Sequence, residues 1–530
     1  MNNRRKKHIE KLIESFGNPK DDSFEFEQIE SYFRNKNNSN SLQVLSDKTC
    51  NDLDFDELFM FIDRTNSKVG QQYLYNKLRV IPADFAGIDT QEKIVTHFTN
   101  DPDFRVSVQT ELSKLNEREA YYVASLFQEE LIQRPKWYAV IQLLSFTSVL
   151  SLVMSFFNPA MFLVLLGVFV VNFGVHYWNK RNLYRYVGSI PQLLKLNNAA
   201  RELYKKPLLQ EINPDLLPSI AVIHNVRNWM SFFNLETKLQ SDIQTMFWGI
   251  FELFKILFLL EPLLLFNTLK QLDSKRKEIE DVFTFVGQID ALLSIASLRK
   301  GVNSFCMPQI TNDKQALAAT EAYHPLIYNC VKNSIRLNKK SILLTGSNMS
   351  GKTSFIRTIG INVITGLTLN TCFAQELRLP HTRIYSAIRI SDDLLNDKSY
   401  YFEEVLTIKD MIDKCESKTS NIFLLDEIFK GTNTIERISA GKAVLSALAK
   451  DNMVFVSTHD IELADLLKDE YELYHFSENV NNKTVDFDYK IKDGKLKNRN
   501  AIRILQINDY PDNIIKEAIE ISKELDKGVT

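Results

Sequence analysis

The stretch Ser341–Arg357, SILLTGSNMSGKTSFIR, has the pattern of a short apolar strand, a polar turn and the start of a helix. It contains GSNMSGKT, a complete match to the pattern G-x-x-x-x-G-K-[ST]. In such a strand–loop–helix unit, backbone N–H groups and the helix N-terminus surround phosphate groups. The stretch therefore predicts a nucleotide-binding α/β domain, with a parallel sheet flanked by helices.

Each part of this loop has an expected contact with a nucleoside triphosphate. Lys352 is expected to reach the β- and γ-phosphates, and the hydroxyl group of Thr353 is expected to bind Mg²⁺. The residues predicted to bind the nucleotide are Gly346, Ser347, Asn348, Met349, Ser350, Gly351, Lys352, Thr353 and Ser354.

Two further apolar strands end in polar residues that suit the same site. The segment NIFLLDE ends in two acids, of which Asp426 is placed to hold Mg²⁺ and Glu427 to polarise the attacking water. Met453–Val456 precedes Ser-Thr-His-Asp, in which His459 is a candidate sensor of the nucleotide or a helper in placing the water. With Lys352, these strand ends predict an ATPase core of the P-loop class that uses ATP and Mg²⁺.

The totals describe a large folded protein. A chain of 530 residues with 45% hydrophobic and 25% charged residues has enough apolar surface for several cores. The net charge of −2 argues against a strongly basic surface, although the 64 Lys and Arg residues leave room for a local basic groove. The five cysteines are scattered and have no spacing typical of a zinc site or a redox motif.

A run of about 43 residues, Trp137–Asn179, contains no Asp, Glu, Lys or Arg. A helix crosses a bilayer with about 20 apolar residues, so the run has room for two crossings. The pair Asn158-Pro159 divides the run and favours a turn. The pattern predicts a transmembrane helical hairpin of roughly Tyr138–Phe157 and Ala160–Trp178. The alternative is a pair of helices buried in a large soluble core.

The residues that flank the run predict its orientation. Arg134 and Lys136 precede it, the cations Lys180, Arg181 and Arg185 follow it, and the connecting turn carries no charge. Under the positive-inside rule both flanks lie in the cytoplasm. We therefore expect a multi-pass protein of the inner (cytoplasmic) membrane, with its ATPase domain in the cytoplasm.

A second apolar stretch, Met246–Phe266, is interrupted by residues that are costly in lipid, namely Glu252, Lys255, Glu261 and Pro262. A single crossing here would also place the two cytoplasmic parts of the chain on opposite sides of the membrane. The stretch is therefore expected to be a buried helix or a helix at the membrane surface.

These motifs resemble those of one family, the MutS mismatch-repair ATPases. The family's phosphate loop is close to TGPNMGGKST, and this chain has TGSNMSGKTS at Thr345–Ser354. The family's DEIGRGTST is similar to Asp426–Thr434, DEIFKGTNT, and its ATHY is similar to Ser457–Asp460, STHD. The Asn-Met pair inside the loop is far more specific than the general pattern. The resemblance implies an ABC-like ATPase domain of the MutS type.

The resemblance also implies a dimer with composite sites. The segment Ile390–Val405, ISDDLLNDKSYYFEEV, looks like the family's SDDL…STFxxEM loop, whose serine, here Ser399, reaches the γ-phosphate held by the partner subunit. Tyr400 departs from the family's usual threonine. His324 begins a His-Pro pair like the one that leads into the family's ATPase domain. Val331 lies near an aromatic position of the family, and no residue is assigned to stack on adenine.

Outside the ATPase domain the likeness extends to an all-α core and departs in two places. Leu53–Pro82 is similar to the opening of the family's core helices, and the C-terminal end resembles its dimerising element. Only about 50 residues precede the core, too few for the family's mismatch-reading and connector domains, and the uncharged run interrupts the core. The expected order is an N-terminal extension at 1–50, the first part of a MutS core-like domain at 51–136, the transmembrane hairpin at 137–179, a helical core or lever at 180–310, the ATPase domain at 311–500 and a dimerising helical element at 501–530.

The resulting hypothesis is a membrane-anchored MutS-related ATPase that works as a homodimer without classical mismatch recognition. One alternative is a DNA-binding repair or recombination protein that recognises branched or damaged duplex. Basic residues for that role cluster in Lys270–Lys277 and Lys483–Arg503. Another alternative is a membrane scaffold that ATP assembles with little turnover. Salt-dependent DNA binding would favour the first alternative, and dimerisation by nucleotide without hydrolysis would favour the second.

Overall fold

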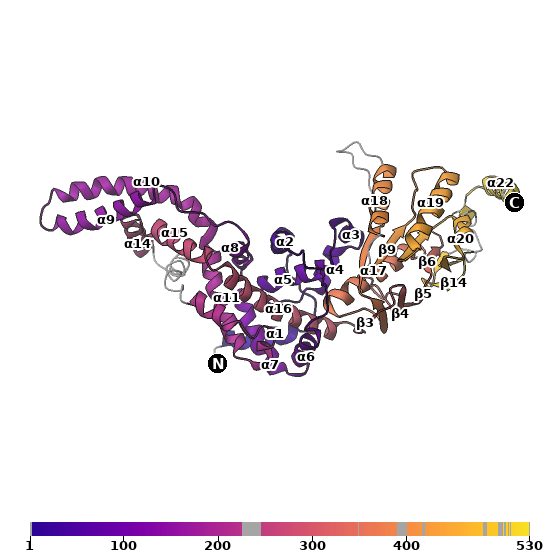
Figure 1. Ribbon diagram of the computed structural model, residues 1–530, viewed down its shortest axis with the longest axis horizontal. Helices are drawn as coiled ribbons and strands as arrows, with labels where there is room; N and C mark the ends of the chain where they lie inside the picture. Colours follow the sequence, from indigo (N-terminus) through magenta and orange to yellow (C-terminus); the bar gives the residue numbers. More distant parts are fainter. Residues whose placement is uncertain are drawn as a thin grey trace. The chain divides into compact units, whose positions relative to one another are not determined.

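The computed structural model describes residues 3–224, 245–347, 349–389, 400–415, 419–480, 485–496, 502, 505–506, 508 and 510–528. The chain forms two compact units, each assembled from segments that are separate in the sequence (Figure 1). The helical unit comprises Met1–Asn37, Ile62–Lys77 and Ala86–Gly301, and the sheet unit comprises Asn38–Phe61, Leu78–Phe85 and Val302–Thr530.

The sheet unit contains two larger sheets. The six-stranded sheet has the order β14-β11-β6-β10-β9-β8, in which β14 is antiparallel to β11 and the other neighbours are parallel. The second sheet is mixed and has the order β3-β7-β4-β5. The strands are β1 (Gln43–Val44), β2 (Val80–Ile81), β3 (Gln309–Thr311), β4 (Ala316–Ala322), β5 (Asn333–Asn338), β6 (Ser341–Thr345), β7 (Glu376–Pro380), β8 (Thr382–Ala387), β9 (Ser420–Asp426), β10 (Met453–Thr458), β11 (Tyr471–His475), β12 (Glu478–Val480), β13 (Val485–Phe487) and β14 (Lys492–Asp493).

The central strands β6, β9 and β10 are the apolar segments that the sequence places in a buried sheet. Every residue of β6 and β10 is buried, as expected for parallel strands covered by helices on both faces. Thr458 pairs with Thr345, and Ser457 pairs with Asp426, so the carboxyl ends of the three strands meet at one edge. The helices of this unit are α3 (Asp47–Asp52), α4 (Phe55–Ile62), α17 (Lys352–Leu369), α18 (Tyr400–Lys414), α19 (Thr434–Ala449), α20 (Ile461–Leu467) and α22 (Asp512–Gly528).

The helical unit is built around α16 (Arg276–Gly301), a 26-residue helix that packs against α6, α8 and α11. Its Asp290 is buried and accepts hydrogen bonds from the backbone N–H groups of Asn66 (2.8 Å) and Ser67 (2.8 Å). Other helices of the unit are α1 (Asn3–Ser15), α2 (Phe26–Asn35), α5 (Lys68–Arg79, whose last residues enter the sheet unit), α6 (Ile88–Asn100), α7 (Pro102–Leu112), α8 (Ser125–Gln128), α11 (Ser189–Tyr204) and α12 (Pro207–Gln210), with 3₁₀ turns at Ser113–Leu115 and Arg118–Val123.

The uncharged run forms a helical hairpin of α9 (Tyr138–Ser155) and α10 (Met161–Val187), which we call the α9–α10 hairpin. The turn lies at the predicted Asn158-Pro159 pair, where the side-chain oxygen of Asn158 accepts the N–H of Ala160 (3.0 Å). The second helix extends nine residues beyond the predicted end at Trp178, because the charged residues after the run continue the helix. Tyr138–Ser155, Met161–Lys180 and Arg276–Gly301 are the described helices long and apolar enough to cross a membrane.

The stretch Met246–Phe266 differs from the single predicted helix. It forms α14 (Thr245–Phe258) and α15 (Leu260–Asp273), which are separated at Leu259. Leu259 has a left-handed backbone (φ 50°), and Pro262 lies in the first turn of α15, where its missing N–H costs no helical hydrogen bond. Both helices pack against the α9–α10 hairpin. The residues of this stretch that would be costly in lipid therefore lie on helices that pack against other helices of the unit.

Candidate functional site

The phosphate loop connects β6 to α17 and has the shape that its sequence predicts. Gly351 adopts φ 104°, and a side chain there would lie 3.2 Å from the ring of Tyr489, so glycine suits this position in both respects. The ammonium group of Lys352 is buried and donates to the carbonyl oxygens of Gly346 (2.8 Å) and Ser347 (2.9 Å). Because α17 begins at Lys352, its unpaired first N–H groups also face this loop. The arrangement forms an anion-binding site.

Oxygen donors gather beside the loop at the ends of β9 and β10. The hydroxyl group of Thr353 donates to Oδ2 of Asp426 (2.7 Å), and the hydroxyl group of Ser457 donates to Oδ1 of the same carboxylate. A hydroxyl and a carboxylate are hard oxygen ligands of the kind Mg²⁺ prefers. The donor set of Thr353 and Asp426 therefore fits Mg²⁺, as the sequence predicts.

Glu427 is held in a fixed position next to these donors. Its backbone is left-handed (φ 54°), and its N–H donates to the carbonyl of Ser457 (2.9 Å). Its carboxylate lies 2.5 Å from Nε2 of His459 and forms an ion pair with Lys430. Burial alone would raise the pKa of Glu427, but the bonds from His459 and Lys430 outweigh burial and bring it to about 2. Glu427 is therefore ionised at neutral pH, as a residue that orients water requires.

The segment after Glu427 has a second strained residue that the sequence did not reveal. Phe429 has φ 59° at a position where the resembled family has glycine. Its N–H donates to Oε1 of the buried Glu404 on α18 (2.5 Å), and Gly431 packs against Tyr401 of the same helix. Burial raises the pKa of Glu404. Contacts with α18, the helix that follows the Ser399 segment, therefore hold Phe429 in its strained backbone conformation.

A cavity of about 510 Å³ opens beside the loop, and residues of β4, β5 and α17 contribute to its lining (these elements are labelled in Figure 1). Its walls include Lys352 and Glu427, and also Val331, Tyr328 and Tyr489. The two tyrosines offer aromatic faces for a base. Sequence patterns gave no signal for them, because Tyr489 follows the loop by more than a hundred residues and belongs to no motif.

The structure brings the predicted residues together as far as it describes them. Those that line or border one site are Gly346, Ser347, Met349, Ser350, Gly351, Lys352, Thr353, Ser354, Asp426, Glu427 and His459. Burial is the main cause that lowers the pKa of Lys352. Two predicted residues, Asn348 and Ser399, lie outside the described residues, so their roles stay predictions.

The basic clusters proposed for DNA binding contain several cations that acids already neutralise. In the first cluster Arg276 pairs with Asp273 (2.7 Å), and Lys275 pairs with Glu278 (3.5 Å). In the second, within its described part, Lys492 pairs with Asp488 (2.5 Å) and Lys495 with Asp465 (2.5 Å). Such pairs reduce the positive potential that would attract a phosphate backbone.

Comparison with known proteins matches the ATPase region to one family. Residues 342–526 match the family described as MutS domain V. The chain is 28% identical over 276 residues to the DNA mismatch repair protein MSH3 of Saccharomyces cerevisiae. It is 26% identical over 266 residues to the DNA mismatch repair protein MutS of Aquifex pyrophilus, and 29% identical over 256 residues to that of Listeria monocytogenes.

The matched region is about half of this chain but a smaller share of each relative. It covers 49% of this chain and 27% of the yeast protein, 47% and 30% for the Aquifex protein, and 46% and 29% for the Listeria protein. The similarity therefore concerns the ATPase region and its surroundings, which contain the site described above.

Proposed function

We propose that the protein is a Mg²⁺-dependent ATPase that works as a membrane-anchored homodimer, because residues 342–526 match MutS domain V, a P-loop ATPase-type domain, and mismatch-repair relatives match about half of the chain. The observation that carries the proposal is that the phosphate loop and Glu427 line one cavity, while Asp426 is hydrogen-bonded to Thr353 and His459 is paired with Glu427. ATP is the proposed substrate, and its hydrolysis to ADP and phosphate is the proposed reaction.

In this proposal the loop binds the phosphates and the tyrosines bind the base. Lys352 exchanges its two carbonyl partners for phosphate oxygens, which are stronger acceptors because they carry charge. Thr353 and Asp426 would hold Mg²⁺, and the bound ion would supply positive charge to offset that of the phosphates. Tyr328 and Tyr489, which line the same cavity, contact the adenine.

Glu427 is the residue proposed to orient the attacking water. Its low pKa leaves a charged acceptor at neutral pH, and His459 and Lys430 fix its orientation. His459 is bound to the carboxylate of Glu427, so a substitution at His459 is also expected to shift the water that Glu427 orients. Glu427 is thus a catalytic residue and His459 a positioning residue in this mechanism.

The dimer is supported by an exposed apolar face near the C-terminus. On α22, Ile514 and Ile521 are spaced by seven residues and therefore lie on one face, and each is nearly half exposed. A second copy of this helix would cover that face. We propose that Ser399 of one subunit then completes the site of the other.

Membrane anchoring is supported by the surface of the α9–α10 hairpin. Large apolar side chains on both helices are exposed, and Trp137 and Trp178 pack together near the base of the hairpin (ring centroids 4.7 Å apart). A contiguous apolar surface of this kind is typical of a membrane contact, and paired tryptophans suit the membrane interface. We propose an inner-membrane location, a cytoplasmic ATPase domain and work other than mismatch reading.

Steady-state ATPase assays of purified variants test the catalytic proposal. Lys352→Ala is expected to lose ATP binding, because the buried ammonium group that meets the phosphates is gone. Glu427→Gln is expected to bind ATP but to hydrolyse it at least about 100-fold more slowly. Lys340→Ala is the control, since that exposed lysine lies outside the cavity. Undiminished hydrolysis in both site variants would refute the assignment.

Membrane fractionation tests the anchor. The double variant Leu163→Asp/Val170→Asp places two charges on one exposed face of α10, and each is expected to cost about 3 kcal/mol in insertion. The protein should then move from the membrane to the soluble fraction. Ile13→Asp/Leu217→Asp, at exposed apolar positions outside the hairpin, is the matched control. If both double variants associate equally with the membrane, the α9–α10 hairpin is not the anchor.

A second candidate function is DNA repair, which the names of the matched relatives favour. This function predicts binding of branched or mismatched duplex that weakens steeply with salt. Gel-shift titrations of the full chain with matched, mismatched and branched DNA at two salt concentrations distinguish it. If none of these DNAs binds at low salt, the DNA-repair function is rejected and the membrane-anchored ATPase remains as the proposal.

A further inference from the structure

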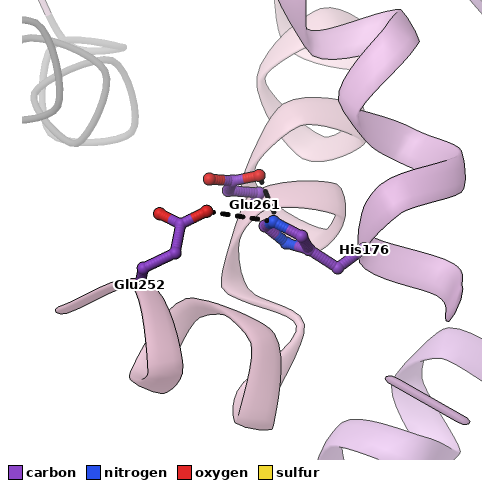
Figure 2. A group of neighbouring side chains, drawn as sticks. All are labelled: His176, Glu252 and Glu261. Carbon is purple, nitrogen blue, oxygen red and sulfur yellow. Dashed lines mark hydrogen bonds and ion pairs between the residues drawn. The ribbon is translucent and has the colours of Figure 1, made fainter. Parts of the chain in front are cut away.

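A group of ionisable side chains lies inside the helical unit, which contains none of the ATPase motifs. Figure 2 shows the ring of His176 of α10 facing the carboxylates of Glu252 of α14 and Glu261 of α15. One nitrogen or oxygen atom from each of the three residues lies within 4.8 Å of the others. Three separate helices supply these residues, so the group is created by the fold and not by the spacing along one helix.

The break at Leu259 is what brings the two carboxylates together. It separates α14 from α15, and Glu261 then lies in the first turn of α15. Both His176 and Glu261 have no exposed side-chain surface, and Glu252 is only 14% exposed. Carboxylates buried to this degree need a cation or several hydrogen bonds to offset their lost hydration.

The cations near the group supply part of that compensation. Lys255 of α14 is also buried, and its ammonium group lies 2.6 Å from Oε2 of Glu252 and 2.5 Å from Oε1 of Glu261. Lys180 of α10, which is more exposed, lies 3.4 Å from Oε1 of Glu252. One buried ammonium group thus bridges two buried carboxylates.

Three buried atoms of the group make no hydrogen bond among the described residues: Nδ1 of His176, Oε2 of Glu252 and Oε2 of Glu261. Oε2 of Glu252 has the ammonium group of Lys255 as its ion-pair partner (2.6 Å), whereas Nδ1 of His176 and Oε2 of Glu261 face each other at 3.4 Å. Two ligand atoms that each lie about 2.1 Å from a tetrahedral metal ion are about 3.4 Å apart. The pair therefore already has the spacing of one edge of a metal coordination shell. An imidazole binds an ion through one nitrogen, so Glu252, whose Oε1 now lies 3.2 Å from Nε2, has to turn toward Nδ1 to complete the site.

We propose that His176, Glu252 and Glu261 form a binding site for a divalent transition-metal ion, and that Lys255 takes the place of the ion when the metal is absent. One imidazole and two carboxylates are a donor set that suits Zn²⁺ and related ions. The ion adds two positive charges and so neutralises both carboxylates. The flexible four-carbon stem of Lys255 lets its ammonium group withdraw as the metal enters.

The site is separate from the nucleotide site. It lies in the helical unit, whereas the phosphate loop lies in the sheet unit. Metal bound here would join α10 to the α14–α15 pair, and thereby hold the α9–α10 hairpin to its neighbours. A failure of the ATPase proposal would leave this proposal untouched, because the two sites lie in different units.

Zinc binding by the full-length, nucleotide-free protein in detergent tests the proposal. We expect one Zn²⁺ per chain after equilibration with buffered free Zn²⁺, measured by elemental analysis, and a zinc-dependent rise in the unfolding temperature. His176→Ala and Glu252→Gln should each weaken binding at least about tenfold. His97→Ala is the matched control, because His97 lies near a carboxylate, Asp101 (3.7 Å), on the exposed face of another helix.

The substitution Lys255→Met separates a metal site from a closed network of ion pairs. If Lys255 stands in for the ion, its removal leaves two uncompensated carboxylates, so zinc should bind at least about tenfold more tightly and restore the lost unfolding temperature. If the network is only structural, the variant is destabilised and zinc has no effect. Absence of stoichiometric zinc in both the wild type and this variant overturns the proposal, as does equal binding by His176→Ala. A folded Glu252→Gln protein keeps the comparison valid if His176→Ala fails to fold.

Discussion

Two helices of the helical unit are both apolar enough to cross a membrane, and their surroundings differ. In α10, 17% of the residues of the apolar window are buried, and in its hairpin partner α9 the share is 22%. In α16 the share is 83%, because α6, α8 and α11 surround it. An apolar helix thus avoids water in either of two ways, by packing in a protein core or by facing something outside the unit.

The polar residues of α16 and α10 also differ in their surroundings. In α16, Asp290 is paired with backbone N–H groups of a neighbouring loop, so it is part of the core. In α10, Asn172 and His176 face α14 and α15, and the opposite side of the hairpin is apolar and exposed. Polar side chains therefore mark which side of each helix faces protein.

The largest expected effect comes from the same substitution at two matched valines. Val286 of α16 is fully buried, whereas Val170 of α10 is 67% exposed. Val286→Asp buries an unpaired carboxylate and is expected to lower the free energy of unfolding by about 4 kcal/mol or more. Val170→Asp should cost only a small fraction of that in detergent, where the charge stays solvated.

Thermal unfolding of both detergent-solubilised variants, followed by circular dichroism, measures this difference. Retained helix content with a lowered unfolding temperature for Val286→Asp, and a near-normal temperature for Val170→Asp, would sharpen the comparison. Equal losses would show that the exposed face of α10 packs against protein after all, and the distinction between the two helices would then be wrong.

The sequence alone predicts the hairpin and the phosphate loop, but it does not predict the break between α14 and α15. The hairpin and its turn at Asn158-Pro159 follow from the missing charges, and the phosphate loop with Asp426 and Glu427 follows from local motifs. Both signals are local, because neighbouring residues in the chain are neighbours in the fold. The break at Leu259 has no such signal, since leucine has no preference for a left-handed backbone.

The contacts that cross between helices were not predictable for the same reason. The sequence marks Glu252, Lys255 and Glu261 only as residues that are costly in lipid, and their mutual pairing with His176 depends on how α10, α14 and α15 meet. Likewise, Tyr489 reaches the nucleotide cavity from a distant part of the chain. Sequence patterns thus identify the chemistry of a segment, and the fold decides its partner.

A smaller effect is expected from the pH dependence of Asp290. Burial raises its pKa to about 6, partly offset by the hydrogen bonds from Ser67 and Asn66. A carboxyl group with a higher pKa in the folded state stabilises the fold below its unfolded pKa, near 4, and loses this contribution as pH rises through 6. The shift of about 2 pKa units corresponds to about 3 kcal/mol.

The measurement is the difference in unfolding free energy between the wild type and Asp290→Asn from pH 4 to pH 7. The wild type should lose about 2 kcal/mol relative to the variant over this range, because pH 4 already lies slightly above the unfolded pKa and the asparagine has no charge to bury. The difference removes the contribution of all other titrating groups. A difference that does not change with pH would mean that Asp290 is already ionised at pH 4 and that its hydrogen bonds outweigh its burial.

The smallest effect is expected at Asn172, the polar counterpart of Asp290 on α10. Its side-chain N–H groups donate to the hydroxyl oxygen of Ser148 (2.9 Å) and to the carbonyl oxygen of Leu257 (2.7 Å), while its own oxygen is buried without a partner. Asn172→Leu removes two hydrogen bonds and one unsatisfied acceptor, so the net cost should be about 0.6 kcal/mol and below about 2 kcal/mol.

A double-mutant cycle with Ser148→Ala, followed by thermal unfolding in detergent, isolates the contact between the two side chains. We expect a coupling near 0.6 kcal/mol, since polar contacts between helices in an apolar surrounding are worth little on average. A loss as large as that of Val286→Asp would instead mean that polar contacts hold α14 against the hairpin. The polar side of α10 would then matter as much to the fold as the apolar core around α16 does.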